Sequence, residues 1–195
     1  MNEITKADIK NLMDNRVWIT KKARMEAEAR MNQSHLFTQL LINYYTFIVL
    51  AFSIGTLVSQ DSKMSLLTVN ASVGLFGLSI FIGAMGHREK ALQYKESYLS
   101  LNELEFDLKY LLRNEKEAKD VLVDELKVYE KKYTEILTKS ENHKDIDYIK
   151  VLIKHNMKVS TRDFFRYYTQ KTMYFVCGFL VVVAPIIGTF IYLKS

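Results

Sequence analysis

The polar side chains with the most regular spacing lie inside an otherwise apolar stretch. They occur near positions i, i+4, i+7 and i+14, on one face of an α-helix, and are Gln39, Asn43, Thr46 and Ser53. Amides and hydroxyls in this arrangement either hydrogen-bond to another helix or line a hydrated lumen, because hydrocarbon offers them no partner. Asn70, in a second apolar stretch, has the same chemistry. These five residues are candidate pore-lining or interhelical polar residues, and both alternatives remain open.

Residues suited to covalent or metal chemistry are few and scattered. His143 lies close to Asp145 and Asp147, but a zinc site normally has further His or Cys ligands nearby, so we interpret this segment as a polar loop. Cys177 is the single cysteine, which rules out a disulfide within the chain. There is no nucleophile elbow and no glycine-rich phosphate loop. We therefore predict no catalytic residue, no metal and no cofactor, and expect that the protein is not an enzyme.

The polar candidates are carried by stretches long enough to cross a membrane. Met31 to Gln60 is uncharged over 30 residues, Met64 to Gly86 is uncharged over 23, and Thr172 to Leu193 is the most hydrophobic. An α-helix needs about 20 apolar residues to cross a hydrocarbon core about 30 Å thick. We predict three transmembrane helices, at about 36–59, 64–86 and 172–193, of which the first two form a tight hairpin.

The second predicted span carries small residues that would let another helix approach closely. Asn70, Gly74 and Gly77 share one face, and Gly83 belongs to a second run of small residues. Such faces are typical of close packing between transmembrane helices. We interpret Gly74, Gly77 and Gly83 as packing positions, either within the hairpin or between protomers.

Basic residues near the span ends indicate how the chain is oriented. They gather before the first span, after the second and before the third, and are nearly absent from the hairpin tip and the C-terminal tail. Basic flanks favour the cytoplasmic side, so we expect a cytoplasmic N-terminus and a C-terminus outside. The formal net charge of +5 is modest. It fits the surface of a membrane and does not favour direct binding to nucleic acid.

Helical periodicity also governs the polar segments. Residues 6–30 predict an amphipathic helix that runs on into the first span, with apolar residues at Ile9, Leu12 or Met13, Val17, Ala23, Ala27 and Met31. Residues 87–137 predict cytoplasmic helices with a break at 115–120, followed by a loop over 138–145. Asp145 is expected to cap a last short helix that leads to the third span.

Two apolar stripes within residues 87–137 need a packing partner. The first consists of Leu101, Leu104, Leu108 and Leu111 or Leu112, and the second of Leu122, Leu126, Tyr129, Tyr133 and Ile136 or Leu137. With only seven Gly and one Pro in the chain, little interrupts the helices. We predict an all-α membrane protein, with a first part over residues 1–137 and a second part over 138–195.

The order of short motifs around the hairpin resembles that of the SLATT family. Before the spans come Trp18, residues 20–24 (TKKAR) and 26–30 (EAEAR); after them come residues 88–91 (REKA), Tyr94 and Tyr98. SLATT proteins are two-transmembrane effectors found beside nucleotide-second-messenger synthases, SLOG sensor domains and, in some subfamilies, reverse transcriptases in bacterial defence loci. The resemblance covers about residues 10–140, and the basic unit of the family has two spans rather than three.

This resemblance implies a membrane effector in the bacterial inner membrane. Once an upstream cytoplasmic sensor fires, such an effector forms a pore or perturbs the membrane and causes growth arrest or cell death. The partners it implies are a sensor, a nucleotide synthase or a reverse transcriptase, and the family has no catalytic motif to carry over. The positions that the resemblance implies for coupling to the sensor are Trp18, Lys21, Arg24, Arg30, Arg88, Tyr94 and Tyr98.

Three spans from one chain cannot enclose an aqueous pathway, so a pore requires several protomers. We therefore expect a homo-oligomer in the lipid bilayer. The competing hypothesis is a non-catalytic membrane anchor or scaffold, in which the spans hold cytoplasmic helices that recruit a partner enzyme.

Overall fold

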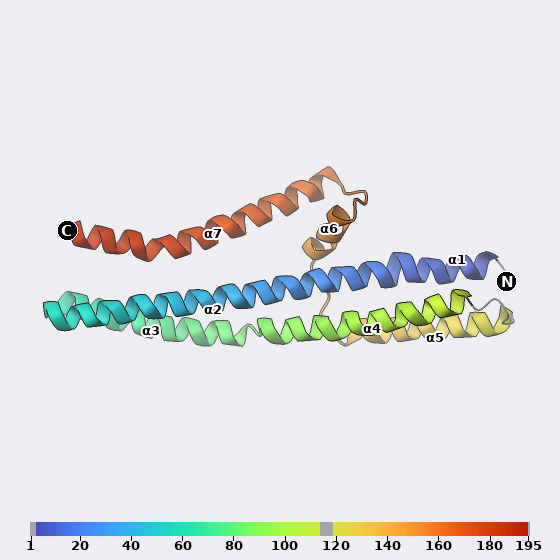
Figure 1. Ribbon diagram of the computed structural model, residues 1–195, viewed down its shortest axis with the longest axis horizontal. Helices are drawn as coiled ribbons and strands as arrows, with labels where there is room; N and C mark the ends of the chain where they lie inside the picture. Colours follow the sequence, from blue (N-terminus) through green and yellow to red (C-terminus); the bar gives the residue numbers. More distant parts are fainter. Residues whose placement is uncertain (1–2, 114–118, 195) are drawn as a thin grey trace. The chain divides into compact units, whose positions relative to one another are not determined.

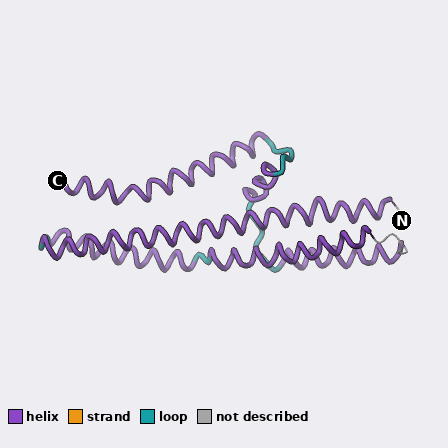
Figure 2. Tube along the Cα trace, in the orientation of Figure 1, coloured by secondary structure: helices purple, strands orange, loops and turns teal. Residues whose placement is uncertain are grey.

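The computed structural model describes residues 3–113 and 119–194, and every regular element in these ranges is helical (Figures 1 and 2). In chain order the elements are α1 (Glu3–Asn11), the π-helical segment η1 (Leu12–Trp18), α2 (Ile19–Ser59), α3 (Ser62–Ala84), α4 (His87–Arg113), α5 (Lys119–Thr138), α6 (Asp145–Lys154) and α7 (Thr161–Lys194). The all-α prediction is confirmed. The predicted break at residues 115–120 falls mostly outside the described ranges.

The chain divides into two compact units. The first, here named the helical unit, consists of residues 1–32 and 88–167. The second, the span unit, consists of residues 33–87 and 168–195. Each unit is thus assembled from segments that lie far apart in the sequence, and both α2 and α7 contribute residues to both units.

In the span unit, α2 and α3 form the predicted tight hairpin. Gln60, with a φ of 52°, and Asp61 make the whole connection, and the Asp61 side chain accepts a 2.9 Å hydrogen bond from the Lys63 amide at the start of α3. α3 ends at Ala84 rather than Gly86, because Gly86 adopts a φ of 62° that turns the chain into α4. Within the described residues, three helical stretches are long and apolar enough to cross a membrane.

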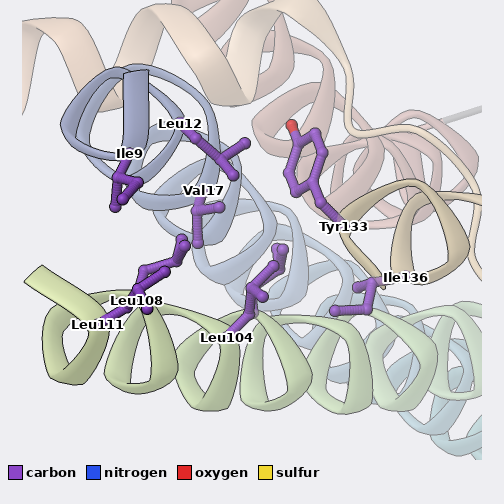
Figure 3. Packing of buried hydrophobic residues seen from close by; sticks show 9 residues of the cluster. Ile9, Leu12, Val17, Leu104, Leu108, Leu111, Tyr133 and Ile136 are labelled. Carbon is purple, nitrogen blue, oxygen red and sulfur yellow. The ribbon is translucent and has the colours of Figure 1, made fainter. Parts of the chain in front are cut away.

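The helical unit is built around one cluster of apolar side chains, which point toward one another in Figure 3. Its buried members are Ile9, Leu12 and Val17 from α1 and η1, Leu101, Leu104, Leu108 and Leu111 from α4, and Tyr133 and Ile136 from α5. The two predicted apolar stripes are therefore faces that pack, apart from Leu122, whose side chain lies outside the described residues. The beginning of the chain supplies their common partner, and each buried Leu or Ile contributes about 1.5–3 kcal/mol.

The helix at the start of the chain departs from regular α-geometry where the apolar spacing was ambiguous. Leu12 and Val17 are both buried although they are five residues apart, and the segment that contains them is π-helical. A π-helix bonds residue i to i+5 and so brings such residues onto one face. Leu12 is consequently a full member of the core, whereas Met13 is half-buried. α1, η1 and α2 follow one another without a gap, which confirms the predicted continuous helix.

α6 follows the predicted loop, but Asp145 does not cap it as expected. The Asp147 carboxylate accepts a 3.1 Å hydrogen bond from the amide of Lys144, which is the residue just before the helix. A carboxylate three residues beyond the N-cap position can reach back to that amide, as in a capping box. Asp145 is exposed, and its Oδ2 lies 3.7 Å from Nη1 of Arg166.

Candidate functional site: a buried clamp and an uncovered polar face

Lys21 begins a series of polar contacts that α2 makes within the helical unit. Its Nζ pairs with Oε2 of Glu105 on α4 and donates a 3.1 Å hydrogen bond to Oδ1 of Asn102. Oε1 of Glu105 also accepts a 2.5 Å hydrogen bond from Lys109. Burial opposes the ionisation of Glu105, but the hydrogen bonds and charges of the two lysines outweigh it and hold the pKa of Glu105 below its usual value. The ionised carboxylate therefore joins α2 to α4.

Arg24 is fully buried and caps the end of α5. Its Nη1 and Nη2 donate hydrogen bonds of 3.3 and 3.4 Å to the carbonyls of Ile136 and Leu137. The last carbonyls of an α-helix have no partner within the helix, and a cation there complements the helix dipole. Burial lowers the pKa of Arg24, while the hydroxyls of Tyr133 and Tyr94 act in the opposite direction. The guanidinium thus fixes α2 to the backbone of α5.

Two charged contacts hold α6 against α2. Arg30 binds the carboxylate of Asp147 through both oxygens, with Nε–Oδ1 and Nη2–Oδ2 distances of 2.8 Å, and Asp147 is only 2% exposed. One turn earlier, Oε2 of Glu26 lies 2.7 Å from Nζ of Lys150, and Oε1 lies 2.8 Å from Nζ of Lys154. Burial disfavours the ionised form of Glu26, yet the hydrogen bonds and charges of these lysines hold its pKa below its usual value. Asp147 therefore both caps α6 and binds α2.

Aromatic side chains add further contacts around this part of α2. The ring of Trp18 meets that of His155 edge-on, with centroids 4.9 Å apart. The Tyr94 hydroxyl donates a 3.1 Å hydrogen bond to the carbonyl of Asn142, in the loop between α5 and α6. Both contacts join the segments beside α6 to the helices that flank the predicted hairpin.

The other two coupling candidates are less enclosed. Tyr98 is half-buried, and burial raises its pKa, as does the negative charge of Glu28. Arg88, in the first turn of α4, is exposed. The other five candidates contact segments that are distant in the sequence, and they are Trp18, Lys21, Arg24, Arg30 and Tyr94.

We name the charged part of this arrangement the clamp, which comprises Lys21, Arg24, Glu26 and Arg30 together with Glu105, Asp147, Lys150 and Lys154. The acidic members Glu26, Glu105 and Asp147 were not identified from the sequence. One signal could have pointed to part of the clamp. Glu26 and Arg30 are one helical turn apart, and so are Lys150 and Lys154, which is the spacing of charges that share a helix face.

The polar segment from His143 to Asp147 is distributed among separate contacts. Asp147 belongs to the clamp, whereas Asp145 is exposed. Burial lowers the pKa of His143, and the charge of Arg24 lowers it further, against the opposing charges of Asp147 and Asp145. His143 lies in the loop before α6, whereas Asp145 and Asp147 lie in the first turn of that helix.

In the span unit, other described residues do not cover the predicted polar face of α2. The exposed candidates are Gln39, Asn43 and Thr46 on α2 and Asn70 on α3. The Thr46 hydroxyl donates to the Ile42 carbonyl at 2.8 Å, and the part-buried Ser53 donates to the Val49 carbonyl at 3.0 Å. These hydroxyls are satisfied by their own helix. The three amide side chains find no hydrogen-bond partner among the described residues.

The three candidate packing glycines also face open space. A Cβ atom placed on Gly74, Gly77 or Gly83 would meet no atom within 4 Å in the described part of the chain. The close approach expected at these positions is therefore absent within the described hairpin. Packing between protomers stays a prediction.

The chain matches a known family over most of its length. The family model of the SMODS and SLOG-associating 2TM effector domain, family 5, matches residues 6–193. The match extends beyond the region of resemblance at about 10–140 and takes in α7 up to residue 193. No curated protein and no solved structure matches the chain.

Proposed function

The chain belongs to family 5 of the SMODS and SLOG-associating 2TM effector domains, the SLATT family, and on this premise we propose that it is a pore-forming effector of a bacterial defence system. Several copies assemble in the inner membrane when a cytoplasmic sensor fires, and ions then leak across the membrane. Growth arrest or cell death follows. The sensor, nucleotide synthase or reverse transcriptase expected from the resemblance would act on the helical unit.

The uncovered polar face of α2 is the observation that carries this proposal. Gln39 and Asn43 are exposed on a helix whose other exposed residues at this level include Leu40 and Phe47. Burying an amide in hydrocarbon without a partner costs about 2–7 kcal/mol. A second protein surface or a column of water removes that cost, and in an oligomer α2 can meet both. We infer that the polar face lines the pathway between protomers.

The clamp supports the second half of the proposal, which is control by a cytoplasmic input. It binds the N-terminal part of the same helix, α2, that carries the polar face. A partner that competes for Arg30 or Glu26 would release α6 from α2. We infer that the clamped arrangement is the resting state and that its opening precedes assembly.

Leakage from lipid vesicles tests the proposal without a known trigger. The full chain is reconstituted into vesicles loaded with a small fluorescent dye, and Arg30→Ala is used to open the clamp. The wild-type protein should leak slowly and Arg30→Ala rapidly. Replacing Gln39 and Asn43 with Leu and Thr46 with Val in the Arg30→Ala protein should abolish the leak. Ser53→Ala in that protein serves as a control, because Ser53 is part-buried within one chain, unlike the exposed Gln39, Asn43 and Thr46.

Two results would count against the proposal. Leakage that persists without the polar face would show that Gln39, Asn43 and Thr46 do not line the pathway. Vesicles that stay sealed with Arg30→Ala, although the protein is inserted and folded, would favour the membrane scaffold instead.

A further inference from the structure

Pro185 lies within α7, and a proline there leaves one backbone group without its helical partner. Proline has no amide hydrogen, so the carbonyl four residues earlier, that of Val181, loses its donor. In a membrane this carbonyl cannot turn to bulk water, and it must find a donor on a neighbouring helix or in its own side chains. The sequence predicts that the Val181 carbonyl lacks an amide donor, but it does not predict which group replaces that donor.

Two adjacent tyrosines of α2 supply donors at this point. The Tyr45 hydroxyl donates a 2.7 Å hydrogen bond to the Val181 carbonyl, and the Tyr44 hydroxyl donates a 3.0 Å hydrogen bond to the carbonyl of Val182. The two rings stand nearly perpendicular, at 84°, with centroids 5.7 Å apart. This geometry lets neighbouring residues of one helix reach neighbouring carbonyls of another.

A third contact fixes the direction of the two helices. The end of the Phe37 ring would lie 3.4 Å from a Cβ atom placed on Gly178. Phe37 precedes Tyr44 by about two turns, and Gly178 precedes Val182 by about one, so α2 and α7 run parallel within the span unit. The lack of a side chain at Gly178 leaves room for the Phe37 ring.

We propose that Tyr45, with Tyr44 beside it, is a positioning residue that holds α7 on α2 by supplying the hydrogen bond that Pro185 removes. At about 100° per residue, Gln39, Asn43 and Thr46 lie roughly 150 to 170° around α2 from the tyrosine pair. α7 therefore occupies the face opposite the polar residues and leaves them uncovered. The role concerns the packing of one chain, and it holds whether or not the protein forms a pore.

A double-mutant cycle on the full chain in detergent micelles tests this role. Tyr45→Phe removes the hydroxyl and keeps the ring, and unfolding by added SDS should show an equilibrium constant shifted toward the unfolded state by about threefold, the scale of one hydrogen bond between membrane helices. Pro185→Ala restores an amide that can bond to the Val181 carbonyl. In the Pro185→Ala protein, Tyr45→Phe should therefore have little effect.

The controls separate this role from a general effect of the ring or of the proline. Tyr174→Phe removes a hydroxyl from an exposed ring of α7 and should leave the equilibrium unchanged. Pro185→Leu supplies the same amide with a different side chain and should repeat the result of Pro185→Ala. Equal effects of Tyr45→Phe with and without Pro185, or an effect no larger than that of Tyr174→Phe, would overturn the proposal. The unfolding experiment does not measure leakage. A negative result for Tyr45 can therefore be told apart from a negative result for the pore.

Discussion

Hydrogen-bonding groups meet the buried carboxylate of Asp147 and two nitrogens of the buried guanidinium of Arg24. Asp147 binds Arg30 with both oxygens, and Arg24 rests on the last carbonyls of α5. Moving such groups out of water costs several kcal/mol, and this cost is repaid only when the geometry is complete. Loss of Arg30 would leave the carboxylate of Asp147, only 2% exposed, without its paired charge.

Arg30→Ala is expected to destabilise the helical unit by about 2–3 kcal/mol. Removing one member of a buried pair costs about 3–5 kcal/mol, and the partial exposure of Arg30, whose side chain is 24% exposed, reduces that figure. Thermal unfolding of the full chain in detergent measures the difference. Arg88→Ala, at an exposed arginine, should change stability by less than about 0.5 kcal/mol. Equal effects of the two substitutions would contradict this account of the clamp.

Sequence reasoning located three basic members of the clamp but not Lys150, Lys154 or its acidic members. Lys21, Arg24 and Arg30 stand in a recognisable order before the hairpin, so the resemblance marks them. Their partners lie between 81 and 117 residues away along the chain, and those of Arg24 are backbone carbonyls, which every residue has. With 22 acidic residues in the chain, spacing alone cannot select Glu105 or Asp147.

At the scale of elements, the π-helical segment sets the register of the N-terminal helix. Leu12 and Val17 reach one core because the segment holds one residue more than an α-helix would need to bring them to the same face. The periodicity of a regular α-helix does not place residues that are five apart on one face. The sequence pattern therefore left Leu12 and Met13 as alternatives, although it predicted the helix itself and the stripes of α4 and α5.

Deleting Asn15, an exposed residue of η1, is expected to convert the segment to a regular α-helix and preserve the core. Leu12 and Val17 would then be four apart and would still share a face, so stability should change by no more than about 1 kcal/mol. Deleting Ser100 from α4 is the matched control. It rotates one half of α4 against the other by about 100° and displaces the stripe that contains Leu104 and Leu108.

Circular dichroism and thermal unfolding measure the helical content and the stability of the two deletion proteins. A folded Asn15-deleted protein beside a poorly folded Ser100-deleted protein is the expected outcome. Unfolding of the Asn15-deleted protein to the same extent would show that the π-helical segment is itself required.

At the scale of the whole molecule, the sequence predicted the number of spans, the hairpin and the helical character, because these depend on length and local periodicity. It did not predict how the chain is partitioned. The helical unit draws on residues from both sides of the hairpin, and this depends on contacts that no local pattern encodes.

Assembly of several chains through the polar face predicts cross-links at Asn43. In a protein with Cys177→Ser, Asn43→Cys should give covalent dimers in vesicles treated with a short thiol-reactive cross-linker. Thr68→Cys, at a position only 6% exposed within one chain, should give few. Dimer yields that are equal at the two positions, seen on denaturing gels, would contradict assembly through this face.

The partition of the helical unit also imposes an order on biosynthesis. Arg24 leaves the ribosome long before its partners at Ile136 and Leu137, which follow 112 and 113 residues later. At about 5–20 residues per second, this interval lasts roughly 6 to 23 s. Both helices of the hairpin are complete within that time. The newly made chain therefore passes through a stage in which the hairpin exists and the contacts of Arg24 with α5 do not.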